Sequence, residues 1–243
     1  MKELNITKNS KLFALGVGVN KNTTPNTLVD AQNSDCDIIA LKFENLEAIE
    51  NLKNLLPHIS KPLMICASGD DEIDKFLLPE VIKLLDRKCI ISDANEQTYK
   101  EIIPSVISGN HYIVLKSPID INLAKELNIL SVDMGLDKSK IIMNTDIGGL
   151  GYGYEYGFSI MEKVIQEGKK GDEYLEFPLF TDASSEALKT KEARSEDYSA
   201  SYGNLNDRRK MIELTACTGV IAAGANIIMV NIPENISILK GLV

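Results

Sequence analysis

A glycine-rich segment near residue 150 is the part of the sequence best suited to contact a ligand. It reads NTDIGGLGYGYEY over residues 144–156 and contains Gly148, Gly149, Gly151 and Gly153. Glycine adopts positive φ angles without strain and lets a ligand approach the backbone amides, and the N-terminus of a following helix favours acceptor groups. A third glycine of a dinucleotide-binding motif would fall at Tyr156, so the segment is not that motif. The residues alone leave two interpretations open: a ligand-binding loop and a flexible connection.

Polar side chains also follow most of the strand-like runs of the chain. Amides and hydroxyls outnumber ionised groups among them, which suits hydrogen bonding to a large polar ligand better than acid/base catalysis. We therefore predict a binding site without catalytic residues. The residues at these ends are Asn20, Lys42, Ser68, 93–95, Lys116, Ser117, 144–153, Thr181, Asp182 and Asn231.

Two of these residues, Lys42 and Lys116, allow an alternative. A lysine that loses its charge inside a barrel forms a Schiff base with a carbonyl substrate, as in aldolases. An ion-paired lysine has no such activity, and the sequence singles out no proton-transfer partner for either residue.

The cysteine and histidine positions predict neither a metal site nor an iron–sulfur cluster. Cys36, Cys66, Cys89 and Cys217 are widely spaced within apolar runs, and no CxxC pair occurs. Such cysteines are expected to be buried free thiols. The two histidines lie apart from any ligand at metal-binding spacing, so we interpret both as structural.

The elements that must position these residues are eight short apolar runs separated by amphipathic stretches. This alternation is typical of β/α units and a parallel sheet, and eight units in 243 residues favour a (β/α)₈ TIM barrel over an open sheet. We predict one domain, 1–243, with a lead-in at 1–11 and a long loop at 193–207. The runs are 12–19, 37–43, 62–67, 89–92, 112–116, 140–144, 176–180 and 226–230.

The composition of the chain limits the classes of molecule that it is expected to bind. A formal net charge of −9 opposes binding to phosphate backbones, so we expect no nucleic-acid partner. No apolar run approaches the roughly 20 residues of a membrane span, and the first residues lack the pattern of a secretory signal. We expect a cytoplasmic protein that binds proteins and small molecules.

The motifs then resemble a known family, the small (delta) subunit of the corrinoid iron–sulfur protein. The resemblance extends from about residue 37 to the C-terminus and is most specific over 117–162. The segments that carry it are GGLGYG at 148–153, EY and FSIME at 155–162, SPIDIN at 117–122, and NEQTYK at 95–100.

This resemblance implies a barrel related to the pterin-binding methyltransferases. It implies a heterodimer in which the barrel mouth covers a corrinoid (cobalamin) cofactor shared with a large subunit, which carries the iron–sulfur cluster. The pair would accept a methyl group from methyltetrahydrofolate through a methyltransferase and pass it to acetyl-CoA synthase, in the reductive acetyl-CoA (Wood–Ljungdahl) pathway. The cofactor-binding residues would be Asn95, Ser117, Asn144, Asp146, Gly148, Gly149, Gly151, Tyr152, Gly153 and Thr181.

The chain departs from the family pattern at two strand ends. Asn144 and Thr145 replace an Asp-Pro pair, and Asn231 and Ile232 replace an Arg-His pair. A stand-alone barrel enzyme is the alternative function: a pterin-dependent methyltransferase with Asn95 and Asp146 on the pterin amides, or the lysine aldolase.

Overall fold

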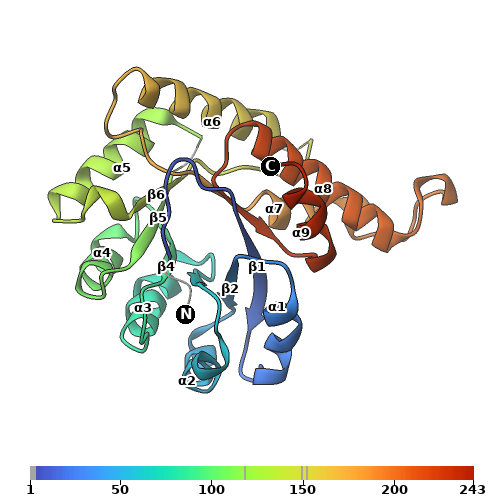
Figure 1. Ribbon diagram of the computed structural model, residues 1–243, viewed down its shortest axis with the longest axis horizontal. Helices are drawn as coiled ribbons and strands as arrows, with labels where there is room; N and C mark the ends of the chain where they lie inside the picture. Colours follow the sequence, from blue (N-terminus) through green and yellow to red (C-terminus); the bar gives the residue numbers. More distant parts are fainter. Residues whose placement is uncertain (1–3, 118, 149, 152) are drawn as a thin grey trace.

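Eight parallel strands form a nearly closed barrel in the computed structural model, which describes residues 4–117, 119–148, 150–151 and 153–243 (Figure 1). Each strand overlaps one of the eight predicted runs, so the TIM-barrel prediction is confirmed. The strands are β1 (Leu12–Val19), β2 (Ile38–Phe43), β3 (Leu63–Cys66), β4 (Ile90–Ala94), β5 (Tyr112–Lys116), β6 (Ile141–Asn144), β7 (Phe180–Thr181) and β8 (Ile227–Val230).

The sheet has the order β6-β5-β4-β3-β2-β1-β8-β7, which follows the chain around the barrel. Between β6 and β7 the described residues form one isolated bridge, Met143 to Leu179. The Met143 amide also donates to the Pro178 carbonyl at 2.8 Å. The barrel therefore has one weak seam, and β7 is shorter than the predicted run 176–180.

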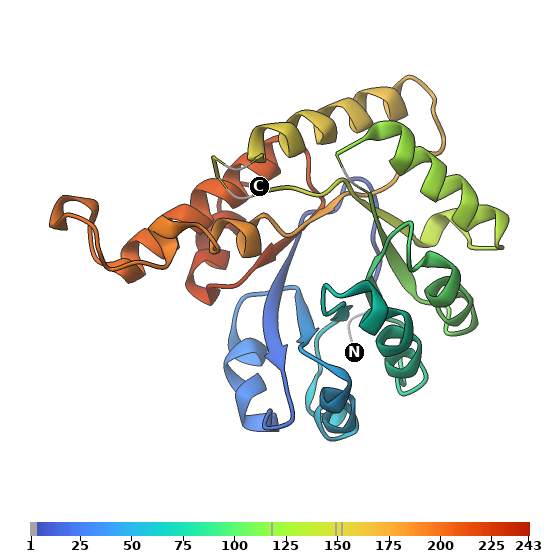
Figure 2. The same cartoon turned by 180° about the vertical axis from the view of Figure 1, so that it is seen from behind.

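Helices surround the barrel and cover the outer face of the strands (Figure 2). Several begin at a capping side chain: Asp120 accepts the Asn122 and Leu123 amides at the start of α5, for example. Such caps satisfy backbone donors that the helix itself leaves unpaired. The helices are α1 (Val29–Asn33), α2 (Ile49–Leu55), α3 (Asp71–Ile82), α4 (Tyr99–Ser108), α5 (Ile121–Asp133), α6 (Tyr154–Lys169), α7 (Ala183–Ala187), α8 (Leu205–Ala222) and α9 (Pro233–Lys240). None of the described helices is long and apolar enough to cross a bilayer.

The apolar core has two layers, because each strand is buried on both faces. The outer layer lies between strands and helices. The inner layer fills the barrel and includes Leu4 and Ile6 from the lead-in, and the Tyr112 hydroxyl donates to the Leu4 carbonyl at 3.3 Å. The N-terminal segment therefore packs against the inner layer at the amino ends of the strands. The carboxyl ends of the strands, at the opposite end of the barrel, line a polar cavity.

The stretch predicted as a loop at 193–207 is partly ordered into helical turns. It contains a 3₁₀ turn at Ala200–Tyr202, and α8 already begins at Leu205. The segment extends away from the barrel, as the orange part of the ribbon shows (Figures 1 and 2).

Candidate functional site

A cavity of about 340 Å³ opens at the carboxyl ends of the strands. Its floor includes Cys66, Phe180 and Met229, which belong to the inner apolar layer. Its polar lining comes from the ends of β2, β4, β5, β6 and β7. The principal polar groups are those of Lys42, Asp93, Lys116, Asn144, Asp146 and Asp182. This is the end of a TIM barrel at which active and binding sites are found.

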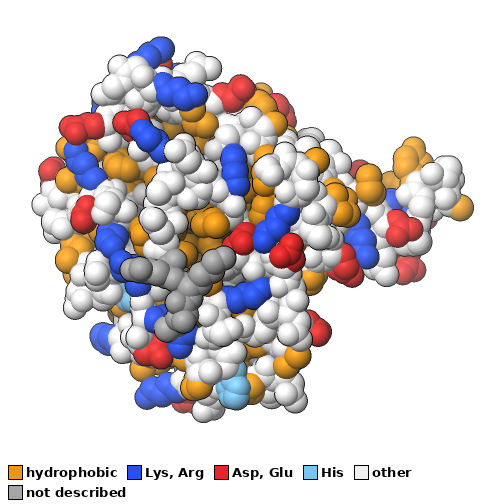
Figure 3. Space-filling model, in the orientation of Figure 1, with side chains coloured by type: hydrophobic (Ala, Val, Ile, Leu, Met, Phe, Trp, Pro, Cys, Tyr) orange, Lys and Arg blue, Asp and Glu red, His pale blue; other side chains and the backbone are white. Residues whose placement is uncertain are grey.

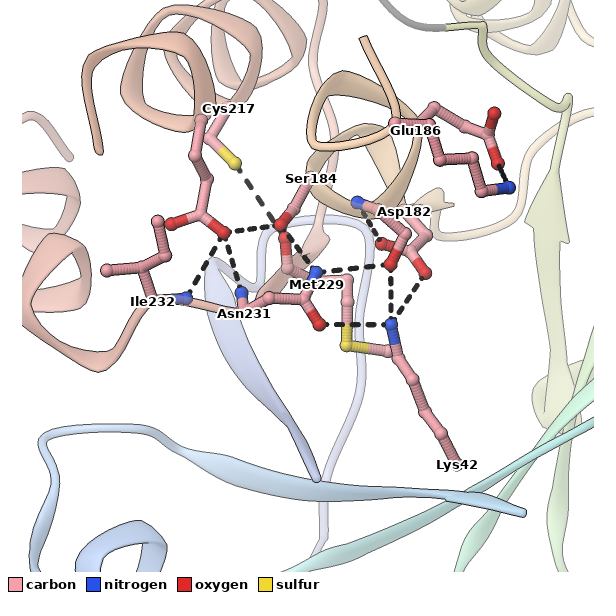
Figure 4. A network of polar contacts seen from close by, with 11 residues as sticks. Lys42, Asp182, Ser184, Glu186, Cys217, Met229, Asn231 and Ile232 are labelled. Atoms are coloured by element: carbon pink, nitrogen blue, oxygen red, sulfur yellow. Dashed lines mark hydrogen bonds and ion pairs between the residues drawn. The ribbon is translucent and has the colours of Figure 1, made fainter. Parts of the chain in front are cut away.

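On one side of the cavity the Lys42 ammonium is fully engaged. Its Nζ donates to Asp182 Oδ2 at 3.0 Å, to Ser185 Oγ at 2.6 Å and to Asn231 Oδ1 at 3.1 Å (Figure 4). Asp182 Oδ1 also accepts the Ser185 amide at 3.0 Å and so caps α7. An ammonium has three donors, and all three have acceptors here.

Behind Lys42 the network continues to a buried carboxylate, Glu213. Its Oε1 accepts the amides of Asn231 at 2.7 Å and Ile232 at 3.2 Å and the Ser184 hydroxyl (Figure 4). Its Oε2 accepts Asn235 Nδ2 at 2.7 Å. Burial raises the pKa of Glu213, while these donors act in the opposite direction. The Asn231 side chain joins the two halves, because its Nδ2 donates to Ser184 Oγ at 2.6 Å.

Gly16 on β1 makes room for this network. A Cβ atom at that position would lie 2.6 Å from Asn231 Oδ1 and 2.9 Å from Lys42 Cε. The absence of a side chain at residue 16 therefore allows Lys42 to reach across to Asn231.

On the opposite side of the cavity the charged groups are loosely paired. Lys116 Nζ lies 3.7 Å from Asp146 Oδ1, and the two side chains are 37% and 45% exposed. Burial would lower the pKa of Lys116, but the carboxylates of Asp93 and Asp146 outweigh it and raise that pKa. An amine must be uncharged to attack a carbonyl, so a protonated Lys116 does not suit the Schiff-base alternative.

Asp93 is the least satisfied group in the cavity. Within the described part of the chain its carboxyl makes no hydrogen bond or ion pair. Burial, opposed by the charge of Lys116 and assisted by the nearby carboxylates of Asp74 and Asp146, raises its pKa to about 6. A partly buried carboxyl without a partner is able to accept donors from a ligand.

Of the predicted site residues, Asn144 and Asp146 line this cavity. Asn144 Oδ1 accepts the Asp146 amide at 3.0 Å, and Asp146 has a positive φ of 57°. Ser117 and Thr181 are adjacent to lining residues, but both are buried outside the lining, and neither hydroxyl has a partner among the described residues. Asn95 also lies outside the lining, where its Nδ2 donates to Asp71 Oδ1 at 2.7 Å.

The described glycines of the glycine-rich loop do not line a single binding site. Gly148 lies just beyond the cavity lining, and Gly151 borders a separate hollow with Thr190 and Glu192. Gly153 precedes α6 with φ 103°, a left-handed conformation that favours glycine. The predicted residues Gly149 and Tyr152 lie outside the described residues.

Sequence reasoning missed the partnerships at this site. Lys42, Asp93, Asp182 and Asn231 all lie at the carboxyl ends of strands, and that position was the available signal. Glu213 lies within α8 and carries no comparable signal.

The described residues contain no group of three His, Cys, Asp or Glu side chains placed to hold a metal ion. All four cysteines are buried free thiols, as predicted. His111 has a structural role: its Nδ1 accepts the Cys89 amide at 3.1 Å, and burial lowers its pKa to about 4.

Comparison with known proteins identifies the family. Residues 26–214 match the model of the CO dehydrogenase/acetyl-CoA synthase delta subunit. The chain belongs to this delta-subunit family. The resemblance drawn from the glycine-rich motif is thereby confirmed.

Curated members of the delta-subunit family show the same relationship at moderate identity. The acetyl-CoA decarbonylase/synthase complex subunit delta of Methanocaldococcus jannaschii is 28% identical over 196 residues, which are 80% of this chain and 48% of that protein. The Methanopyrus kandleri subunit is 29% identical over 135 residues, covering 55% of this chain and 34% of that protein. The matched part of the chain thus spans about half the length of the first relative.

Solved structures of other proteins support the barrel fold of this chain. A dihydropteroate synthase from Xanthomonas albilineans, with 4-aminobenzoic acid, has a TM-score of 0.69 and 13% identity, covering 98% of this chain and 93% of that one. The Plasmodium falciparum HPPK-DHPS protein has a TM-score of 0.65 and 16% identity, covering 97% of this chain and 46% of that one. At these identities the likeness shows the fold alone.

Proposed function

We propose that this chain is a binding subunit of an acetyl-CoA decarbonylase/synthase-type complex. Its barrel mouth covers a corrinoid held jointly with a corrinoid iron–sulfur large subunit, during methyl transfer from methyltetrahydrofolate to acetyl-CoA synthase. Membership of the delta-subunit family supports the complex. The observation that carries the binding role is that Lys42, the most buried cation of the cavity, is committed to three acceptors.

The size of the cavity determines how a corrinoid would bind. Pockets that enclose drug-sized ligands have about 300–1,000 Å³, and a corrin ring with its amide side chains is larger than such ligands. A cavity of about 340 Å³ is therefore too small to enclose it. The macrocycle would instead lie across the mouth, where it would supply the cobalt centre that carries the methyl group.

The side chains at the mouth suit this arrangement. The corrin periphery carries amides, which both donate and accept hydrogen bonds. Lys116 offers donors, and Asp146 offers acceptors that are 45% exposed at the side-chain level. These two residues would orient the ring through its amide side chains, without taking part in bond breaking.

Copurification with the large subunit tests this function. We expect the pair to show corrinoid absorbance, and we expect Lys116→Ala and Asp146→Ala to lower the corrinoid content several-fold. Lys83→Ala is the matched control, because Lys83 is a surface lysine of the α3 region paired with Glu80. A pair that forms without corrinoid would contradict the proposal.

A second candidate function is favoured by one observation, the unpartnered carboxyl of Asp93. Adjacent N–H donors on the edge of a pterin would satisfy such a carboxyl, and a bicyclic ring suits the cavity volume. A structural neighbour at 12% identity is a dihydropteroate synthase in complex with 7,8-dihydropteroate. This candidate is a stand-alone pterin-dependent methyltransferase.

Calorimetry with methyltetrahydrofolate separates the two functions. Binding by the isolated chain that is lost in Asp93→Asn and kept in Asn95→Ala would assign the pterin to this cavity. Loss in Asn95→Ala alone would place the pterin outside the cavity, near the loop after β4. No binding in the wild-type chain would remove this second candidate.

A further inference from the structure

Residues 195–207, which we call the arm, form a projection that the barrel architecture does not require. The arm joins the β7 region to α8 and extends well beyond the other helices (Figures 1 and 2). A connection between these elements needs only a few residues, and longer ones are commonly functional. The cavity site does not include any residue of the arm.

The arm is held in a defined shape by one side chain, Arg208. Its Nε donates to the Glu192 carbonyl at 3.2 Å, and its two terminal nitrogens donate to the carbonyls of Gly203 at 2.7 Å and Ser195 at 2.5 Å. Its guanidinium also stacks 4.9 Å from the ring centre of Tyr198. The arginine is 8% exposed, so its side chain is part of the interior of the arm.

The far part of the arm presents an aromatic pair. Tyr198 and Tyr202 meet edge to face with ring centres 6.0 Å apart, and Tyr202 is 66% exposed. Hydrophobic side chains are visible at the end of this projection (Figure 3). An ordered tyrosine loses little conformational freedom on binding, and tyrosine is enriched among residues that dominate interface energies.

The charge of the arm restricts its partner. Residues 195–207 contain three carboxylates, at Glu196, Asp197 and Asp207, and the one cation that reaches into the arm is the buried guanidinium of Arg208. The whole chain has a formal net charge of −9, which opposes docking of the arm onto a second copy. A complementary surface is therefore basic and belongs to a different protein.

We propose that the arm docks onto the large subunit of the complex, inserting Tyr202 into an apolar recess bordered by lysine or arginine side chains. The identity of this partner rests on the proposed function; the chemistry of its recess rests on the arm. Arg208 orders the loop before the partner arrives, so that association does not have to order it. The large subunit would then contact this chain in two separate regions, the mouth of the cavity and the arm.

Binding of the purified large subunit to this chain, followed by interferometry at several salt concentrations, tests the proposal. We expect Tyr202→Ala to raise Kd about 30-fold, the change that a hot-spot residue of ~2 kcal/mol produces. We expect Asp197→Lys to slow association and to weaken its dependence on salt. Phe76→Ala is the matched control, because Phe76 is an equally exposed aromatic residue (65%) on α3.

The outcomes separate the arm from the proposed function. Binding that is unchanged in both arm variants overturns the docking role and leaves the proposed function standing. Absence of binding by the wild-type chain overturns the large subunit as partner and the arm proposal with it. A dimer of the chain alone, seen by analytical ultracentrifugation and lost in Tyr202→Ala, would overturn the choice of partner. Unchanged circular dichroism of each variant shows that the loss is not one of folding.

Discussion

The two lysines of the cavity stand in opposite environments. Lys42 donates to three oxygens, and its network reaches a fully buried Glu213. Lys116 has one long contact to Asp146 at 3.7 Å, beside an unpartnered Asp93. The two lysines at strand ends therefore have different roles. Lys42 takes part in a hydrogen-bond network that stabilises the barrel, whereas the charged groups around Lys116 have few protein partners and are able to bind a ligand.

Removal of Glu213 should give the largest effect. Glu213→Ala leaves two backbone amides and two side chains without their acceptor and creates a cavity, so we expect a loss of about 3–4 kcal/mol in the free energy of unfolding. Urea denaturation measures it. Glu213→Gln, which keeps one oxygen for three of the donors, should cost less than half as much. Equal losses in the two variants would show that the network does not stabilise through these hydrogen bonds.

A methyl group at residue 16 should also destabilise the hydrogen-bond network around Lys42. Gly16→Ala places a Cβ 2.6 Å from Asn231 Oδ1, and relief of that overlap should cost about 2 kcal/mol. Gly18→Ala on the same strand is the control, since a Cβ there meets nothing within 4 Å, and we expect a change within about 0.5 kcal/mol. Both are measured by thermal and urea unfolding. Similar losses would indicate a strand effect instead of an overlap.

Replacement of each lysine by methionine should change the free energy of unfolding by different amounts. Lys42→Met leaves Asp182 and Asn231 without their donor, and we expect a loss of about 1–2 kcal/mol. Lys116→Met removes an exposed, long ion pair and should change stability by less than about 0.5 kcal/mol. Denaturation midpoints of the two variants compare them directly. A larger loss at Lys116 would reverse the contrast between the two sides.

Asp93 is the one position of the cavity at which we expect a substitution to raise the stability of the chain. Its pKa is about 6 in the folded chain, against about 4 for an unfolded aspartate, so ionisation costs stability as pH rises through this window. A difference of two pKa units corresponds to at most about 2.7 kcal/mol, and solvent screening reduces it because Asp93 is partly exposed. We therefore expect Asp93→Asn to stabilise the chain by about 1 kcal/mol at pH 8, and the difference should vanish below about pH 4. Unfolding curves at both pH values check it. A pH-independent difference would mean that the carboxyl has an ordinary pKa.

The fold was largely predictable because strands and helices leave periodic patterns in the sequence. The boundaries of β1 and β5 agree with the predicted runs, since each is a continuous apolar segment bounded by polar residues. The run at 176–180 was less accurate, because β7 pairs with its neighbours over only Phe180 and Thr181. The prediction of a loop at 193–207 did not take into account that Asn204 caps α8, with its side chain accepting the Asp207 amide.

The site was less predictable because its contacts join distant parts of the chain. Lys42 meets residues 140 and 189 positions away, and only strand register decides which strand-end side chains face the same cavity. Asn144 and Asp146 were placed correctly at the mouth, since Asn144 is the last residue of β6 and Asp146 lies two residues beyond it. Ser117 and Thr181 belong to the same strand ends, but their side chains are buried outside the lining.

The single bridge between β6 and β7 makes this the strand pair with the fewest interstrand contacts in the described part of the barrel. Asn144 and Phe180 of the cavity lie next to the bridged residues Met143 and Leu179. Widening the barrel along this line would break few interstrand hydrogen bonds, whereas widening between β1 and β2 would break a long ladder. Of the strand pairs described, β6 and β7 are therefore the two whose separation would cost the fewest hydrogen bonds.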